Sequence, residues 1–75
     1  MEIKLEQHGS AENNGTIVEL LVEKGQEVKK DQLLLLLEFD KTNFEIVSPI
    51  DGTIKEIFFS LNDSVNVGQT ILIIE

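Results

Sequence analysis

The feature that most constrains this chain is an internal repeat without gaps. Residues 15–38, GTIVELLVEKGQEVKKDQLLLLLE, align at an offset of 37 with residues 52–75, GTIKEIFFSLNDSVNVGQTILIIE. Eight of the 24 aligned positions are identical, and most of the others keep their apolar or polar character. Such a repeat predicts two copies of one supersecondary unit that bury their apolar faces against each other. With only two copies, we expect a closed structure rather than an open solenoid.

The first half of each copy has the composition of a strand followed by a turn. Residues 16–22 and 53–59 are rich in β-branched and other apolar side chains, which favour strands. Glycine and small polar residues then appear within 23–26 and 60–63, which is typical of turns. Each copy therefore begins with a strand that reverses direction at a tight turn.

The second half of each copy ends in a short apolar run. Val28 and Val65 each mark a short middle segment, and the closing runs are Leu33–Leu37 and Thr70–Ile74. Five leucines in succession are also compatible with a helix. The run is short, however, and its partner in the second copy is β-branched, so a strand is favoured in both copies.

Two further strands are predicted outside the copies, at 2–6 and 43–47, because their apolar residues alternate. A polar loop at residues 7–14 joins the first of them to the first copy. The predicted fold is therefore all-β, a flattened barrel or sandwich of two antiparallel sheets. It would contain about eight short strands, with residues 15–38 and 52–75 related by a pseudo-twofold axis.

Length and composition limit the possible functions. We expect a single domain over residues 1–75, because a chain of this size has room for only one. Fourteen acidic residues face six lysines and no arginine, which gives a net charge of −8. This balance argues against binding to nucleic acid or to an anionic membrane surface. No cysteine is present for a disulfide or a thiolate metal site.

The candidate site is the tripeptide Asp40-Lys41-Thr42, which lies between the predicted strands 33–39 and 43–47. Two β runs separated by about three polar residues predict a tight hairpin. The hairpin would hold the Lys41 ammonium group clear of the barrel. A turn lysine taken alone is usually only a solvated side chain, so position in the fold is not enough to assign it a function.

Residues around Lys41 resemble the attachment motif of lipoyl domains, in which Asp-Lys and a small residue occupy a hairpin tip and a glutamate lies three residues before the lysine. Glu38-Phe39-Asp40-Lys41-Thr42 fits this pattern. The likeness covers the whole chain: the glycines at Gly25 and Gly52, the 48–57 stretch SPIDGTIKEI and the 65–69 stretch VNVGQ resemble family positions. An internal repeat is also a property of this family.

Three departures from the family pattern are visible. Lipoyl domains usually have a small residue in place of Phe39, alanine in place of Thr42, and Pro-Asp-Ile-Gly near residues 6–9. The Phe39 ring is compatible with modification of the lysine if it packs beside Phe44, although it could restrict which modifying enzyme fits. The altered loop at 7–14 leaves the partner complex undefined.

The resemblance implies a carrier function. Lipoic acid would be attached to Lys41 through an amide, either by a lipoate ligase or by successive octanoyl and lipoyl transfer. The arm would receive an acyl group from a thiamine-dependent 2-oxo acid decarboxylase and pass it to coenzyme A at an acyltransferase core. A flavin-dependent dihydrolipoamide dehydrogenase would then reoxidise it. The chain itself would be non-catalytic, raising the effective concentration of the arm at each partner.

The residues beside Lys41 have both functional and structural interpretations. Glu38, Asp40 and Thr42 are candidates for recognition by the lipoylating enzyme, while Asp40 is also a turn former and Glu38 a solvated residue at a strand end. Gly25 and Gly52 are assigned mainly to turns, in which glycine is free to adopt positive φ.

Other functions are less compatible with the residues. A biotin carrier shares the expected fold but places methionine on both sides of its lysine, where this chain has Asp40 and Thr42. An unmodified hybrid-barrel interaction module would leave Lys41 unchanged, and the lipoylated glycine-cleavage carrier is longer and contains helices. His8 is the only histidine, and no catalytic or metal-ligating set accompanies it.

The sequence leaves the biological context open. The chain could be a domain of a larger acyltransferase or a free-standing carrier, and the sequence does not identify the 2-oxo acid. Residues 1–6 do not form a signal peptide, and the longest apolar run, 33–37, is too short to cross a bilayer. We expect a bacterial cytoplasmic location, or the mitochondrial matrix in a eukaryote.

Overall fold

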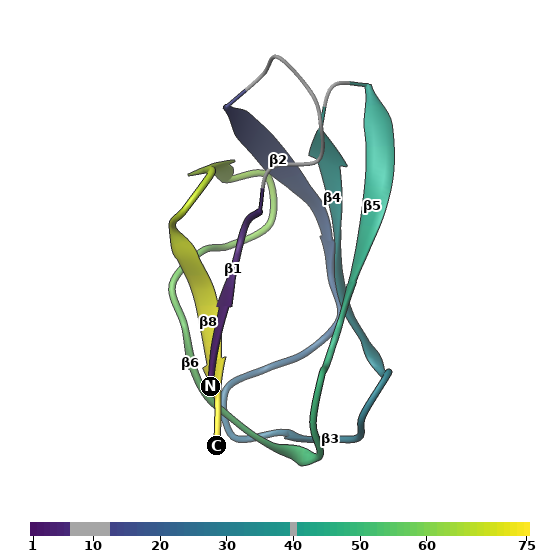
Figure 1. Ribbon diagram of the computed structural model, residues 1–75, viewed down its shortest axis with the longest axis vertical. Helices are drawn as coiled ribbons and strands as arrows, with labels where there is room; N and C mark the ends of the chain where they lie inside the picture. The colour runs from purple at the N-terminus through teal and green to yellow at the C-terminus, as the bar shows by residue number, and fades with distance from the viewer. Residues whose placement is uncertain (7–12, 40) are drawn as a thin grey trace.

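A computed structural model describes residues 1–6, 13–39 and 41–75 of the chain. These residues form eight strands in two facing antiparallel sheets (Figure 1). The strands are β1 (Glu2–Lys4), β2 (Asn14–Leu20), β3 (Glu27–Val28), β4 (Leu33–Phe39), β5 (Thr42–Val47), β6 (Gly52–Ile57), β7 (Ser64–Asn66) and β8 (Thr70–Ile74). The predicted all-β sandwich of two sheets is therefore confirmed. The described part of the chain includes no helix long and apolar enough to cross a membrane.

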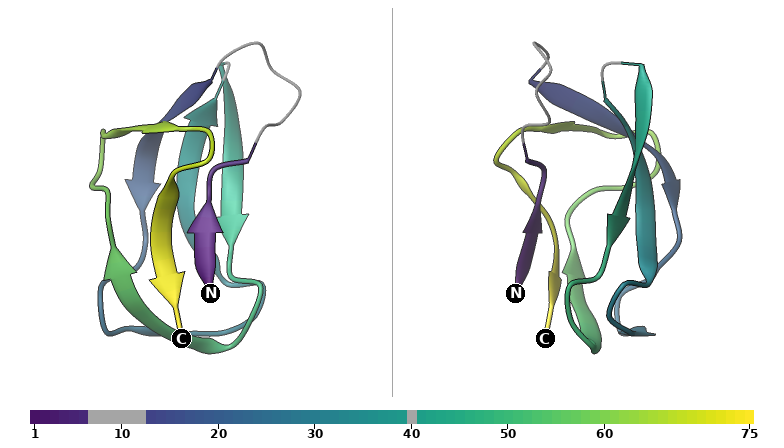
Figure 2. Two further views of the ribbon diagram at one scale, coloured as in Figure 1. Left: turned by 60° about the vertical axis from the view of Figure 1, so that its left-hand side comes forward. Right: turned by 45° about the vertical axis from the view of Figure 1, so that its right-hand side comes forward.

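The two sheets have the strand orders β1-β8-β6-β3 and β5-β4-β2-β7. Figure 2 shows them as two layers that run along the long axis of the molecule. Each repeat copy contributes its two long strands to one sheet and its short middle strand to the other. Thus β7 of the second copy pairs with β2, and β3 of the first copy pairs with β6. Neither copy can complete its sheet without the other.

The pseudo-twofold relation extends to the strand register. Gly15 pairs with Val65 in one sheet, and its repeat mate Gly52 pairs with Val28 in the other. β2 and β4 contain a bulge between Ile17 and Glu19, and β6 and β8 contain one at the equivalent place. A bulge adds one residue to one strand and increases the local twist. The repeat read from the sequence therefore specifies irregular features as well as the strands.

The core lies between the two sheets and draws on both copies. Its side chains are almost entirely aliphatic and are exposed by at most 3%. Its members are Leu5, Ile17, Val22, Val28, Leu34, Leu35, Leu37, Phe39, Ile54, Val65, Ile71, Leu72 and Ile74. The leucine run of β4 contributes two adjacent residues, Leu34 and Leu35, because the register of β4 against β5 shifts between Leu33 and Leu35. Simple alternation would have turned one of them outward.

The two predicted turns adopt a common geometry. Gly25 has a φ of 89° and its repeat mate Asn62 a φ of 72°. Each turn is closed by equivalent backbone bonds, in which Gln26 donates to the carbonyl of Glu23 and Asp63 to that of Ser60, both at 3.1 Å. The prediction that Gly25 serves a turn through positive φ is thus confirmed.

The prediction for Gly52 was wrong. Gly52 is the first residue of β6, and the described glycines with positive φ are Gly25 and Gly68. A Cβ at Gly52 would lie 2.6 Å from the carbonyl oxygen of Glu75 and 2.7 Å from Cγ2 of Ile74. At Gly15 the same atom would lie 2.9 Å from the carbonyl oxygen of Glu38. Both glycines are therefore required by the close approach of a neighbouring strand.

Replacing Gly15 with alanine is expected to lower the free energy of unfolding by about 1–3 kcal/mol, because backbone must move to admit the Cβ. The matched substitution Gly25→Asn should change it by less than about 0.5 kcal/mol, because asparagine tolerates the left-handed conformation and already occupies this position in the second copy. Urea unfolding followed by far-ultraviolet circular dichroism suits a chain without Trp or Tyr. Equal stability of the two variants would contradict the close-approach explanation.

Candidate functional site

Lys41 lies in the connection of the β4–β5 hairpin, at the end of the molecule opposite β3 (Figure 1). The last cross-strand pair before the tip is Phe39 with Thr42, so the connection contains two residues, 40 and 41. The sequence predicted a three-residue connection that included Thr42. That prediction was wrong by one position, because Thr42 begins β5. Asp40 lies outside the described residues.

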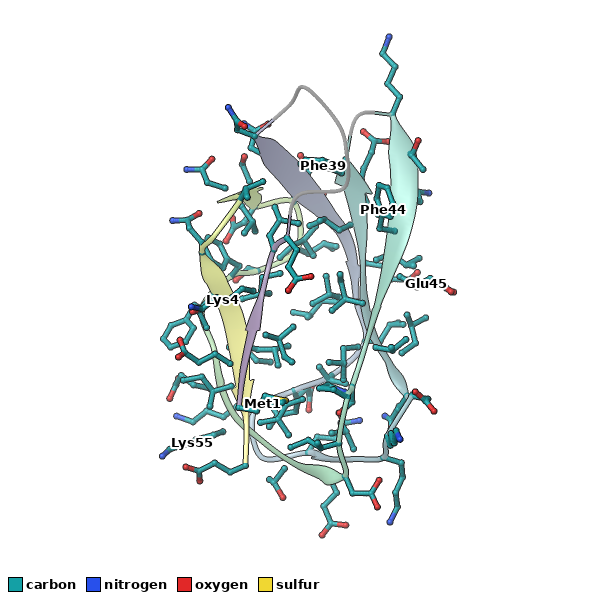
Figure 3. The ribbon with its side chains drawn as sticks, in the orientation of Figure 1. Met1, Lys4, Phe39, Phe44, Glu45 and Lys55 are labelled. Atoms are coloured by element: carbon teal, nitrogen blue, oxygen red, sulfur yellow. The ribbon has the colours of Figure 1, made fainter. Side chains whose placement is uncertain are left out.

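The base of the tip is fixed by two aromatic rings. Phe39 is 1% exposed and packs edge-on against half-buried Phe44, with ring centroids 6.2 Å apart and an interplanar angle of 69° (Figure 3). Edge-to-face pairs of this kind add stability beyond the area they bury. Phe39 therefore packs inward beside Phe44, which is the arrangement that leaves the lysine accessible. The departure from a small residue at this position strengthens the hairpin.

The backbone of Lys41 is left-handed, with a φ of 62°. This conformation brings the Cβ of an L-residue too close to its carbonyl oxygen and costs roughly 1–2 kcal/mol relative to a right-handed residue. Glycine, asparagine and aspartate avoid much of that cost, and they dominate two-residue hairpin connections. The chain has a lysine where stability alone favours a different residue, and such a site is a reason to look for function.

The Lys41 side chain is exposed, and no ion pair to it occurs among the described residues. The described residues also enclose no pocket. A primary amine in this position can reach the active site of another protein without unfolding of the hairpin. The position fits a covalently attached group that must move freely in solvent.

Glu38 is exposed and lies one pair from the tip. It pairs with Asn43 on β5 and with Thr16 on β2. Its repeat mate Glu75 accepts a hydrogen bond from Lys55 Nζ at 2.7 Å, and that bond together with the charge of Lys55 lowers the pKa of Glu75. The position equivalent to Lys55 in the first copy is Val18, so Glu38 has no such neighbour there.

The structure thus brings together only some of the predicted site residues. Glu38, Lys41 and Thr42 share the hairpin end, whereas Gly25 and Gly52 serve a turn and a strand contact elsewhere. Most of the predicted 7–14 loop, including His8, lies outside the described part of the chain. Only Asn13 and Asn14 of this loop are described. Sequence reasoning missed the left-handed Lys41, although the length of the connection was a possible signal.

Comparison with known proteins agrees with the fold. The Biotin_lipoyl family model, described as "Biotin-requiring enzyme", matches residues 1–74. The solution structure of the lipoyl domain of the 2-oxoglutarate dehydrogenase complex from Azotobacter vinelandii superposes with a TM-score of 0.87 and 28% sequence identity. That comparison covers 100% of this chain and 95% of the other.

Curated relatives include the dihydrolipoyllysine-residue acetyltransferase component of the pyruvate dehydrogenase complex from Pseudomonas aeruginosa. It is 44% identical over 61 residues, which are 81% of this chain and 11% of that protein. The dihydrolipoyllysine-residue succinyltransferase component of the 2-oxoglutarate dehydrogenase complex from Staphylococcus saprophyticus is 36% identical over 73 residues, 97% of this chain and 17% of that protein. The chain thus spans less than a fifth of the length of these relatives.

A family match over nearly the whole chain, together with the superposition on a solved lipoyl domain, agrees with the two-sheet sandwich. The chain belongs to the biotin/lipoyl attachment family of domains.

Proposed function

We propose that the chain is a lipoyl carrier domain in which Lys41 bears lipoic acid through an amide bond. The observation that carries this proposal is the placement of a solvent-exposed lysine in the two-residue connection of a hairpin whose base is fixed by Phe39 and Phe44. The relatives named as dihydrolipoyllysine-residue acyltransferases support the choice of lipoic acid. The solved lipoyl domain supports it independently.

Attachment requires an activated acyl group and the neutral form of the Lys41 amine. The amine nitrogen attacks the acyl carbon, the C–N bond forms, the bond to the activating group breaks, and the nitrogen loses a proton. The product is a neutral amide, so the hairpin end loses one positive charge. The protein supplies a fixed backbone and an exposed side chain at Lys41.

When bound, the lipoyl group would supply a dithiolane that accepts an acyl group together with two electrons. The chain's own contribution is positional: it holds Lys41 at the end of the sandwich, where the described residues form no ion pair with the amine. A tethered group is present at each partner at a high effective concentration. The domain would therefore take part in catalysis without performing bond-making of its own.

The partners that follow from this proposal are enzymes that load, discharge and reoxidise the arm. A lipoate ligase or an octanoyl and lipoyl transfer system would modify Lys41. A thiamine-dependent 2-oxo acid decarboxylase, an acyltransferase core and a flavin-dependent dihydrolipoamide dehydrogenase would act on the arm. Membership of 2-oxo acid dehydrogenase complexes among the relatives supports this set.

Incubation with a lipoate ligase, ATP and lipoic acid is expected to add one lipoyl group per chain, as measured by intact mass. Peptide mapping of the product should locate this group on Lys41. A parallel incubation with biotin and a biotin ligase should leave the mass unchanged. The Lys41→Arg variant, which keeps the charge, should remain unmodified by either enzyme. Modification of Lys41 by the biotin ligase alone would replace lipoic acid with biotin in the proposal, and modification by neither enzyme would overturn it.

Replacing Lys41 with asparagine should abolish modification and raise the free energy of unfolding by about 0.5–1 kcal/mol, because asparagine adopts the left-handed backbone at lower cost. Lys29→Asn removes the same charge at an exposed residue that does not have positive φ, and it should give no gain. Urea unfolding by circular dichroism measures both. If the two variants were equally stable, the backbone conformation at Lys41 would carry no energetic cost.

A further inference from the structure

The pseudo-twofold relation makes the outer faces of the two sheets directly comparable. We define the hairpin face as the outward side of β2, β4 and β5, and the opposite face as the outward side of β6, β8 and β1. Glu19, Leu36 and Glu45 form one cross-strand row on the hairpin face. The equivalent row on the opposite face is Glu56, Ile73 and Glu2. Figure 3 shows Glu45 on the side of the molecule away from Lys4 and Lys55.

Each face carries three glutamates at equivalent positions. On the opposite face all three have partners. Glu56 forms an ion pair with Lys24 at 3.4 Å, Glu75 forms one with Lys55 at 2.7 Å, and Glu2 accepts a hydrogen bond from the Thr70 hydroxyl at 2.8 Å. Two of the three negative charges of this face are therefore matched by lysines within the domain, and the third carboxylate has a hydrogen-bond donor.

The hairpin face has the same three carboxylates without those partners. Glu19, Glu38 and Glu45 are exposed, and the described residues supply no ion pair to any of them. The positions that hold Lys24, Lys55 and Thr70 on the opposite face are occupied here by apolar residues. They are Leu61, Val18 and Leu33 respectively.

Two of the apolar residues that replace these partners, and a third beside β4, are exposed. Val18, Val47 and Leu61 are 39%, 42% and 52% exposed. Val47 occupies the place beside β4 that Lys4 occupies beside β8. Single exposed apolar residues are ordinary, but a group of them bordered by polar residues marks an interaction surface. The hairpin face combines unmatched negative charge with apolar anchors, which is complementary to a basic surface that also presents apolar side chains.

The enzyme that modifies Lys41 is the partner that most needs this surface. Before modification the domain has no arm, so a modifying enzyme must distinguish Lys41 from five other lysines by the protein surface alone. An enzyme that activates a carboxylic acid with ATP must bind phosphate oxygens beside its acyl group, and Lys and Arg are the usual ligands of phosphate. The mouth of such an active site is therefore expected to be basic.

We propose that the hairpin face is the docking surface for the lipoate ligase that modifies Lys41, and that Glu19, Glu45 and Val18 contribute to it. The inference rests on the proposed function, since it requires Lys41 to be the acceptor. Docking on this face places the ligase beside Glu38, one pair from the hairpin tip. The opposite face, where all three glutamates have partners within the domain, takes no part.

The test compares matched variants of the two faces in the ligase reaction with ATP and lipoic acid. Val18→Lys places a lysine where Lys55 stands in the second copy, and Lys55→Val makes the reverse change on the opposite face. Val18→Lys is expected to lower kcat/KM for the domain at least about fivefold through KM, because it replaces an apolar contact with a positive charge that faces a basic surface. Lys55→Val should leave kcat/KM within twofold of the parent.

The second comparison uses two double variants, each of which removes two negative charges from one face. Glu19→Gln with Glu45→Gln removes two charges from the hairpin face, and Glu2→Gln with Glu56→Gln removes two from the opposite face. The double variant of the hairpin face should have a higher KM than the parent chain. This difference in KM should shrink as the salt concentration is increased, because salt screens exposed charges. Circular dichroism melting of each variant confirms that it is folded.

The outcomes separate the two proposals. Equal kcat/KM for both faces, with normal modification of the parent chain at Lys41, would overturn the docking surface and leave the carrier function standing. A parent chain that the ligase does not modify would overturn the carrier function and the docking surface with it. A larger loss from the opposite-face variants would assign docking to that face.

Discussion

The reciprocal exchange of short strands between the two copies is the interaction on which the rest of the structure depends. β7 completes the sheet of β2, and β3 completes the sheet of β6, with Gly15 and Gly52 in the pairs that join them. On its other side Gly15 lies against the carbonyl of Glu38, so β2 also positions β4, the strand that leads to Lys41. Closure of the sandwich and placement of the hairpin thus both depend on β2.

Much of the fold was predictable because the sequence contains two copies of the same structural unit. The repeat at an offset of 37 predicted the two-sheet sandwich and the turns at Gly25 and Asn62. The β-branched character of residues 71–74 settled the leucine run as a strand. The role of Gly52 was not predictable, because its constraint comes from the carbonyl of Glu75, a contact set by long-range pairing. Strand ends moved by one or two residues for the same reason.

The site was predictable in part. No property of Lys41 taken alone distinguished it from the other lysines, and the family resemblance supplied its role. The left-handed backbone at Lys41 and the edge-on contact of Phe39 with Phe44 required the structure, because both depend on the register of β5 against β4. The contrast between the two faces was present in the aligned copies as Val18 opposite Lys55. That this contrast leaves the glutamates of one face without cationic partners could be recognised only once the salt bridges of the other face were known.

Both ends of the described chain lie together at the end of the molecule away from the hairpin tip (Figure 1). The terminal ammonium of Met1 donates to the carbonyl of Ile74 at 2.6 Å. If further polypeptide is joined to either terminus, the domain rotates about the end of its long axis where the termini lie, and Lys41 lies at the opposite end. The longest dimension of the sandwich is 33 Å, so the folded body acts as a rigid lever. Its length adds to the radius that any group on Lys41 sweeps, without the entropic cost of a longer flexible tether.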